Sequence, residues 1–217
     1  MKINNREVLG IIFDLDGTLL DSCSIWTDID KAFFKKRGIE QPSDYSKAIG
    51  HIGLDKAATY TIKRFNLNET KEDILKEWKD GVLEQYKHIK LKPGVKEFIN
   101  YLRKEKIPFC AATANDEDCY KSALVSNGIY DYFDFILEVG NYKQGKDNPE
   151  IYLDAAKKLN VNVENCAVFE DLYTALKTCH NAGFVTVAVY EETSKDDEKK
   201  HRVADKYIYD FQELICQ

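Results

Sequence analysis

The chain has 217 residues, of which 44% are hydrophobic and 31% charged, and its formal net charge at pH 7 is −6. This length suits one domain, or a domain with a sizeable insertion, and the composition is that of an ordinary globular protein. Because acidic and basic residues are interspersed, the charge pattern argues against binding to nucleic acid or to an anionic membrane surface. The apolar runs are far shorter than a membrane span requires.

The cysteines and histidines show no pattern that binds metal or forms disulfides. The six cysteines are scattered and form no CxxC pair, and the four histidines have no ligand spacing. Cys110 and Cys166 lie inside apolar runs, so we predict that they are small core residues. Reduced thiols are the expected state, and we therefore expect a cytoplasmic protein without a zinc or redox role for its cysteines.

Short apolar runs predict the strands of a sheet. In chain order they cover residues 8–13, 107–112, 133–139, 166–169, 184–189 and 206–209. Most of these runs are apolar on both faces rather than alternating, which is typical of parallel strands that helices cover on both faces. Amphipathic patterns separate the later runs, and one of them starts with Asn148 as a cap and Pro149 in the first turn. The alternation predicts an α/β fold with a doubly wound, parallel, Rossmann-like sheet.

A gap of about ninety residues separates the first two predicted strands, which is far more than a simple crossover needs. Most of the gap reads as helix, and Ile74, Trp78 and Val82 form one apolar stripe. We predict that residues 21–91 form an inserted all-helical domain. Two segments, residues 1–20 and 92–217, would then form the α/β core.

Polar side chains follow the predicted strands, at the sheet edge where ligands of open α/β folds bind. In chain order these residues are Asp14 and Asp16 after the first strand, Thr113 and Asn115 after the second, Lys146 past the third, and Glu170 and Asp171 after the fourth. They are remote in sequence, but the topology is expected to bring them to one edge.

The chemistry of these residues is mutually consistent. Asp14, Asp16 and Asp171 offer hard oxygen ligands of the kind that Mg²⁺ prefers, while Lys146 and Thr113 suit phosphate oxygens. Asp14 can attack phosphorus, and Asp16 can protonate the leaving oxygen and later deprotonate water. Each residue alone has a plainer explanation, such as a turn, a helix cap or a solvated lysine. Their joint occurrence after successive strands predicts phosphoryl transfer.

The pattern resembles the haloacid dehalogenase superfamily, and within it the phosphatases with a helical cap, over nearly the whole chain. Four segments are similar to the four motifs of that family: FDLDGTLLDS at 13–22, TAN at 113–115, GKDNPEIY at 145–152 and VFEDLYTALKTCHNAGF at 168–184. The first and fourth are specific, whereas the second is short. Two positions depart from the family pattern, because Asp147 replaces the usual proline after the lysine and Leu172 replaces a serine.

The resemblance implies a role for each matched residue. Asp14 would be the nucleophile, Asp16 the general acid/base and donor of a backbone carbonyl to the metal, Thr113, Ala114, Asn115 and Lys146 the phosphoryl-binding residues, Asp171 the anchor of Mg²⁺, and Glu170 a ligand or a partner of one. Residues 21–91 would be the cap that closes over the site and selects the leaving group. A monomer is the default for family members that carry a cap, so the resemblance also implies a monomer.

The family supports several reactions, and individual residues discriminate among them. Dehalogenases lack the second aspartate, so the presence of Asp16 disfavours dehalogenation. Phosphonatases use a cap lysine for a Schiff base, and Lys56 lies in a stretch faintly like theirs. β-Phosphoglucomutases carry a histidine where this chain has Trp26 and an arginine in the cap loop, which is absent near Gly53. Trp26 and His51 remain candidates for specificity residues of the cap.

These observations together favour a Mg²⁺-dependent phosphatase that hydrolyses small phosphomonoesters, with sugar phosphates as one candidate class, through an aspartyl-phosphate intermediate. A phosphosugar mutase of the β-phosphoglucomutase type or a phosphonatase stays open as the alternative. A non-catalytic phosphate-binding protein is disfavoured because a binder needs no nucleophile. The sequence leaves open the substrate, the oligomeric state and the roles of Lys56 and His51.

Overall fold

A computed structural model describes residues 1–194 and 196–215 of the chain. Its centre is a six-stranded sheet in which every neighbouring pair is parallel, in the order β5-β4-β3-β6-β7-β8. The strands are β3 (Gly10–Phe13), β4 (Phe109–Thr113), β5 (Ile136–Glu138), β6 (Cys166–Glu170), β7 (Val185–Val189) and β8 (Lys206–Ile208). The predicted α/β fold with a parallel sheet is therefore confirmed.

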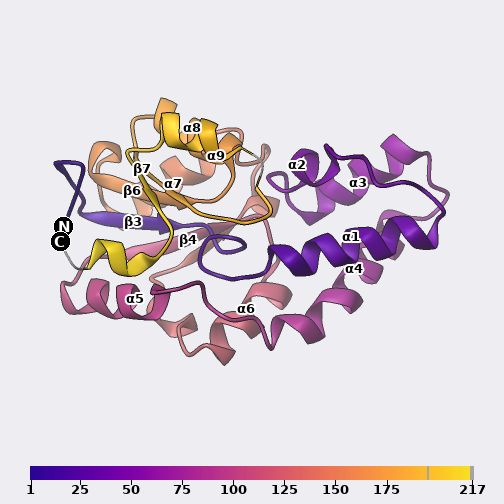
Figure 1. Ribbon diagram of the computed structural model, residues 1–217, viewed down its shortest axis with the longest axis horizontal. Coiled ribbons are helices and arrows are strands. Elements are labelled where there is room, and N and C mark those ends of the chain that lie inside the picture. Colours follow the sequence, from indigo (N-terminus) through magenta and orange to yellow (C-terminus); the bar gives the residue numbers. More distant parts are fainter. Residues whose placement is uncertain (195, 216–217) are drawn as a thin grey trace.

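Helices cover both faces of this sheet (Figure 1). They are α5 (Val95–Lys104), α6 (Glu117–Ser126), α7 (Glu150–Leu159), α8 (Tyr173–Asn181) and α9 (Asp197–Val203), with short 3₁₀ turns η1 (Tyr130–Tyr132), η2 (Val139–Asn141), η3 (Val163–Asn165) and η4 (Phe211–Leu214). Successive residues of a strand point to opposite faces, so Phe13 packs with Phe98 and Phe211 on one side while Ile12 belongs to the core on the other.

Four helices lie between β3 and α5, beside the sheet (Figure 1). They are α1 (Cys23–Lys36), α2 (Tyr45–Ile49), α3 (Leu54–Phe65) and α4 (Lys71–Tyr86), and we call them the inserted helices. The predicted stripe of Ile74, Trp78 and Val82 is buried, and a capping box of Thr70 and Asp73 begins α4. Residues 21 and 91 as domain boundaries stay a prediction.

The two chain segments that join the inserted helices to the sheet run side by side. The backbone N–H of Asp21 donates to the carbonyl of Lys90 at 3.0 Å, and that of Lys92 donates to the carbonyl of Leu19 at 2.9 Å. The entry to α1 and the exit from α4 are therefore tied together. Both segments lie next to the carboxyl end of β3, where the motif aspartates begin.

Several elements differ from the sequence prediction. The first two strands, β1 (Lys2–Ile3) and β2 (Arg6–Glu7), form an antiparallel hairpin that we did not predict, and the short α2 was also missed. Helix α7 begins at Glu150 after Pro149 as its cap, although the side chain of Asn148 still accepts a hydrogen bond from the Glu150 N–H at 3.0 Å. Within the described ranges, no helix combines the length and apolarity that a membrane crossing demands.

The inserted helices contain a buried carboxyl group that predicts a pH-dependent stability. Asp30 on α1 is 5% exposed, and burial raises its pKa from 3.8 to about 6, against a hydrogen bond from Ser46. The folded state thus binds this proton more tightly, so the free energy of unfolding falls as the pH rises between these values. We expect Asp30→Asn to be more stable than wild type by about 3 kcal/mol near pH 8.

The same comparison near pH 3 is expected to show almost no difference, because Asp30 is then largely protonated in both the folded and the unfolded state. Urea unfolding across this pH range measures the effect. Asp28→Asn, at an exposed position of the same helix, is the matched control and should change stability little at either pH. A gain in stability for Asp30→Asn that is equal at both pH values would contradict the raised pKa of Asp30.

Candidate active site

The parallel register of the sheet brings the first and fourth motifs together. Phe13 of β3 is paired with Phe169 of β6, so the next residues, Asp14 and Glu170, come at the same level of neighbouring strands. Thr113 ends β4, the neighbour of β3 on its other side. Carboxylates from both motifs therefore meet at the carboxyl edge of the central strands, where ligands of such sheets bind.

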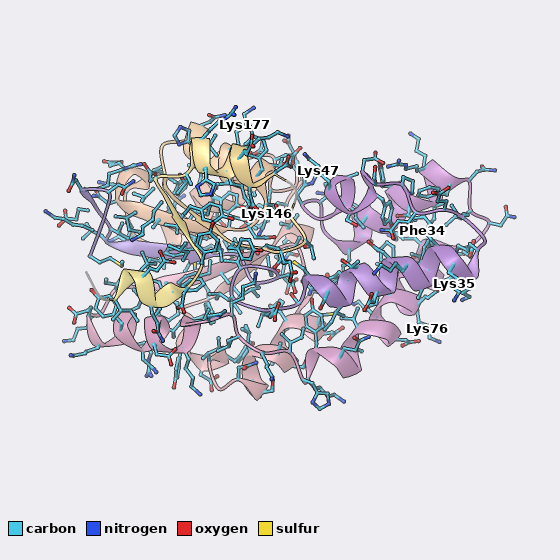
Figure 2. The ribbon with its side chains drawn as sticks, in the orientation of Figure 1. Phe34, Lys35, Lys47, Lys76, Lys146 and Lys177 are labelled. Carbon is cyan, nitrogen blue, oxygen red and sulfur yellow. The ribbon has the colours of Figure 1, made fainter. Side chains whose placement is uncertain are left out.

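Lys146 is buried against two of these carboxylates. Its Nζ donates to Asp14 Oδ1 and, at 2.7 Å, to Glu170 Oε1, which also accepts from the Tyr152 hydroxyl at 2.7 Å. Figure 2 shows Lys146 within the α/β part of the molecule, and its side chain is 1% exposed. Burial alone would lower the pKa of Lys146, but Asp14 and Glu170 outweigh it and raise the pKa.

Asp14, Glu170 and Asp171 form a buried acidic cluster in which one carboxylate oxygen from each lies within 4.8 Å of the others. Lys146 compensates one of the three charges, which leaves two negative charges unbalanced. Burial raises the pKa of both Asp14 and Asp171, and the neighbouring carboxylates add to this effect. Hard oxygen donors with two uncompensated charges fit a divalent cation of the Mg²⁺ type, because the ion would remove the repulsion.

The glycine of the first motif is required by this cluster. Gly17 has φ +80°, and a Cβ at this position would lie 2.6 Å from Asp171 Oδ2 and 2.7 Å from Cys23 Sγ. Any other residue would be strained in its backbone and would collide with the carboxylate. Asp171 also accepts a long hydrogen bond, 3.4 Å, from the hydroxyl of Thr18. The DLDGT turn is thus built around Asp171.

Asp16 lies outside the acidic cluster and accepts hydrogen bonds from three residues. The Ser22 hydroxyl donates to Oδ1 at 2.6 Å, the Asn115 amide donates to Oδ2 at 3.0 Å, and the Tyr86 hydroxyl also donates to Oδ1. Burial and Asp16 raise the pKa of Tyr86, so its hydroxyl stays protonated. The backbone carbonyl that Asp16 would give to a metal remains a prediction.

The second motif, residues 113–115, lies at the same carboxyl edge of the sheet. The Thr113 hydroxyl accepts a hydrogen bond from the Asn115 N–H at 3.0 Å, which leaves its own proton available for a phosphate oxygen. The side-chain carbonyl of Asn115 accepts from the Asp116 N–H at 2.9 Å. The backbone carbonyl of Ala114 faces Gly53 of the inserted segment. Phosphate binding by residues 113–115 stays a prediction.

The candidate residues of the inserted segment are placed next to the core. Trp26 donates from Nε1 to the Tyr86 hydroxyl at 2.5 Å, so it reaches Asp16 through Tyr86. His51 accepts the backbone N–H of Lys146 with its carbonyl at 2.8 Å, while its ring lies 3.3 Å from the Lys47 carbonyl. Lys56 donates to the carbonyls at residues 142 and 143, both at 2.9 Å, and thus links α3 to the core.

Three residues around the site were not predicted: Ser22, Tyr86 and Tyr152. Ser22 and Tyr152 stand inside the quoted first and third motifs, so a closer examination of those motifs could have found them. Tyr86 ends a helix and carries no sequence signal of a site. The departure at Asp147 has little effect on the cluster, because this side chain is exposed to solvent.

A family model described as haloacid dehalogenase-like hydrolase matches residues 11–189. The chain therefore belongs to this family, and it is an enzyme with a hydrolase fold. It is 23% identical over 202 residues to a probable pseudouridine-5'-phosphatase of Drosophila melanogaster, covering 90% of this chain and 87% of that protein. It is also 26% identical over 178 residues to a phosphorylated carbohydrates phosphatase of Thermotoga maritima, covering 80% and 81%.

Solved structures share the fold. The β-phosphoglucomutase of Clostridium difficile superposes with a TM-score of 0.80 at 23% identity, and the match covers 95% of this chain and 93% of that one. This likeness extends over both the sheet and the inserted helices, because it spans nearly the whole chain. At this identity it shows the architecture alone, and the reaction has to be argued from the site.

Proposed function

We propose that this enzyme is a Mg²⁺-dependent phosphatase that hydrolyses small phosphomonoesters through an aspartyl-phosphate intermediate. The observation that supports it most is the buried contact of Asp14 with Lys146 beside Glu170 and Asp171. A carboxylate at a strand end, next to one fixed cation and a site for a second, is suited to attack phosphorus. A protein that only bound phosphate would gain nothing from a carboxylate in that place.

In the proposed reaction, Asp14 attacks phosphorus, and Asp16 gives a proton to the leaving alcohol oxygen. Lys146 and Thr113 hold the non-bridging oxygens of the transferred group. Asp16, now ionised, then takes a proton from water, which attacks the phosphorus of the acyl phosphate. The products are inorganic phosphate and the free carboxylate of Asp14. A bound Mg²⁺ would supply positive charge to the phosphoryl oxygens throughout.

The names of the relatives support small phosphorylated molecules as substrates, with a phosphorylated nucleoside and phosphorylated carbohydrates among them. The inserted helices would act as the cap, since ion pairs such as Lys47 with Asp196 at 2.6 Å and Lys79 with Asp116 at 2.9 Å hold them against the core. Trp26 and His51 are the proposed specificity residues of this cap. The mutase alternative is disfavoured because Trp26 occupies the position of the mutase histidine.

A panel of substrates tests this function. We expect release of inorganic phosphate from a hexose phosphate, a nucleoside monophosphate or another small phosphomonoester, and we expect chelation of the metal to abolish it. A mutase would interconvert hexose 1-phosphate and hexose 6-phosphate with little phosphate release. A phosphonatase would act on a phosphonate of the panel, and Lys56→Arg would then be inactive. No turnover of any phosphomonoester would contradict the proposal.

A further inference from the structure

The Tyr86 hydroxyl has a complete and directional set of hydrogen bonds. The indole Nε1 of Trp26 donates to it at 2.5 Å and the amide of Asn115 donates to it at 3.1 Å. A phenol has two lone pairs and one proton, and both of these partners are donors only. Among the described residues, its proton therefore goes to Asp16 Oδ1, the acceptor in contact with it.

The orientation of the Asn115 amide is fixed by its other end. Its carbonyl oxygen accepts the N–H of Asp116 at 2.9 Å, so the amide nitrogen must face Asp16 and Tyr86. The assignment of donor and acceptor around Tyr86 thus does not depend on a choice of amide rotamer. The ring of Tyr86 is fully buried, which holds the hydroxyl in place.

Two of the three donors to Asp16 come from the two ends of the inserted helices. Ser22 is the residue before α1, and Tyr86 is the last residue of α4. The orientation of the Asp16 carboxylate is consequently set where the inserted helices enter and leave the core. The third donor, Asn115, comes from the sheet edge itself.

We propose that Tyr86 is a positioning residue that orients Asp16 for proton transfer, with Trp26 and Asn115 directing its O–H onto that carboxylate. This inference rests on the function proposed above, in which Asp16 protonates the leaving group. Proton transfer depends on alignment, and a misplaced acid loses much of its contribution. Because Tyr86 belongs to α4, its hydrogen bond to Asp16 also makes proton transfer depend on the position of the inserted helices.

The leaving group of the substrate provides the test. A nitrophenolate departs without protonation, whereas an alkoxide needs the proton from Asp16. For Tyr86→Phe, we expect kcat/KM for an alkyl phosphomonoester to fall by about 10- to 100-fold, and kcat/KM for 4-nitrophenyl phosphate to stay within about threefold of wild type. The ratio of the two values is the readout, because a general structural defect would lower both.

Tyr45→Phe is the matched control. Tyr45 is also fully buried in the inserted helices, and its hydroxyl forms a hydrogen bond with the Thr61 hydroxyl at 2.7 Å. Among the contacts of the described residues, neither Tyr45 nor Thr61 touches Asp16. The ratio should not change in this variant. If Tyr86→Phe does not fold, Trp26→Phe removes one directing donor and should shift the ratio in the same direction by a smaller factor.

A double-mutant cycle separates action through Asp16 from an independent effect. In an Asp16→Asn background, Tyr86→Phe should cause no further loss on the alkyl substrate. An unchanged ratio in Tyr86→Phe, or equal losses in both backgrounds, would overturn the inference and leave the proposed function intact. Full activity of Asp14→Asn would instead overturn the proposed function, so the two failures are distinguishable.

Discussion

Replacing Asp14 with asparagine is expected to lower kcat for every phosphomonoester by at least about 10³-fold, because the amide cannot form the acyl phosphate. The substitution keeps the shape of the side chain and removes one of the clustered negative charges, so the variant should fold. Steady-state assays with and without Mg²⁺, together with a thermal denaturation curve, measure both properties.

Asp21→Asn is the control for this result, since Asp21 is exposed and lies only seven residues further on. We expect its kcat to equal that of wild type within about twofold. If a folded Asp14→Asn variant kept a tenth of the wild-type activity, Asp14 could not be the nucleophile. The proposed function would then have to be abandoned.

Asp171→Asn is expected to weaken Mg²⁺ binding while it raises the stability of the metal-free protein. Burial and the charges of Asp14 and Glu170 raise the pKa of Asp171, so its ionised form costs stability when no cation is present. Near pH 8 and without metal, the variant should therefore unfold at a higher temperature than wild type. Wild type should gain about 2.7 kcal/mol at a Mg²⁺ concentration about 100 times its Kd, and the variant much less.

The activity of Asp171→Asn should move in the opposite direction, with kcat/KM at least about 100-fold below wild type. Asp131→Asn, at an exposed position remote from the motifs, controls for the loss of one carboxylate. Differential scanning calorimetry with and without Mg²⁺ measures the stabilities. A variant that is destabilised without metal, or that gains as much from Mg²⁺ as wild type, would contradict the metal site.

The sheet was predictable because its strands are local features. Residues 166–169 are apolar at every position and residues 184–189 at every position but Thr186, and such apolar runs indicate buried parallel strands. Asp14, Glu170 and Asp171 could be placed together for the same reason, since each lies at or directly after the end of a strand whose neighbour is set by the topology. Their chemical roles follow from residue type and stay predictions.

Other features depend on packing that sequence periodicity does not encode. Tyr86 reaches Asp16 only because the end of α4 returns to the start of α1, and nothing in a helical pattern specifies that meeting. Lys200 stands in a strongly charged stretch of the sequence, which is typical of a solvated helix face, yet its side chain is fully buried and its ammonium pairs with Asp197 at 2.8 Å. The burial of Lys200, like the contact of Tyr86 with Asp16, arises from tertiary structure.

Chemical trapping of the phosphorylated enzyme is the most direct test of this account. Enzyme mixed with excess substrate and quenched in acid would be treated with hydroxylamine, which converts an acyl phosphate into a hydroxamate, and the modified residue would be mapped by mass spectrometry. We predict a hydroxamate on Asp14 that depends on substrate and on Mg²⁺. A phosphorylated residue other than Asp14, or turnover with no trapped acyl phosphate at any quench time, would contradict the account.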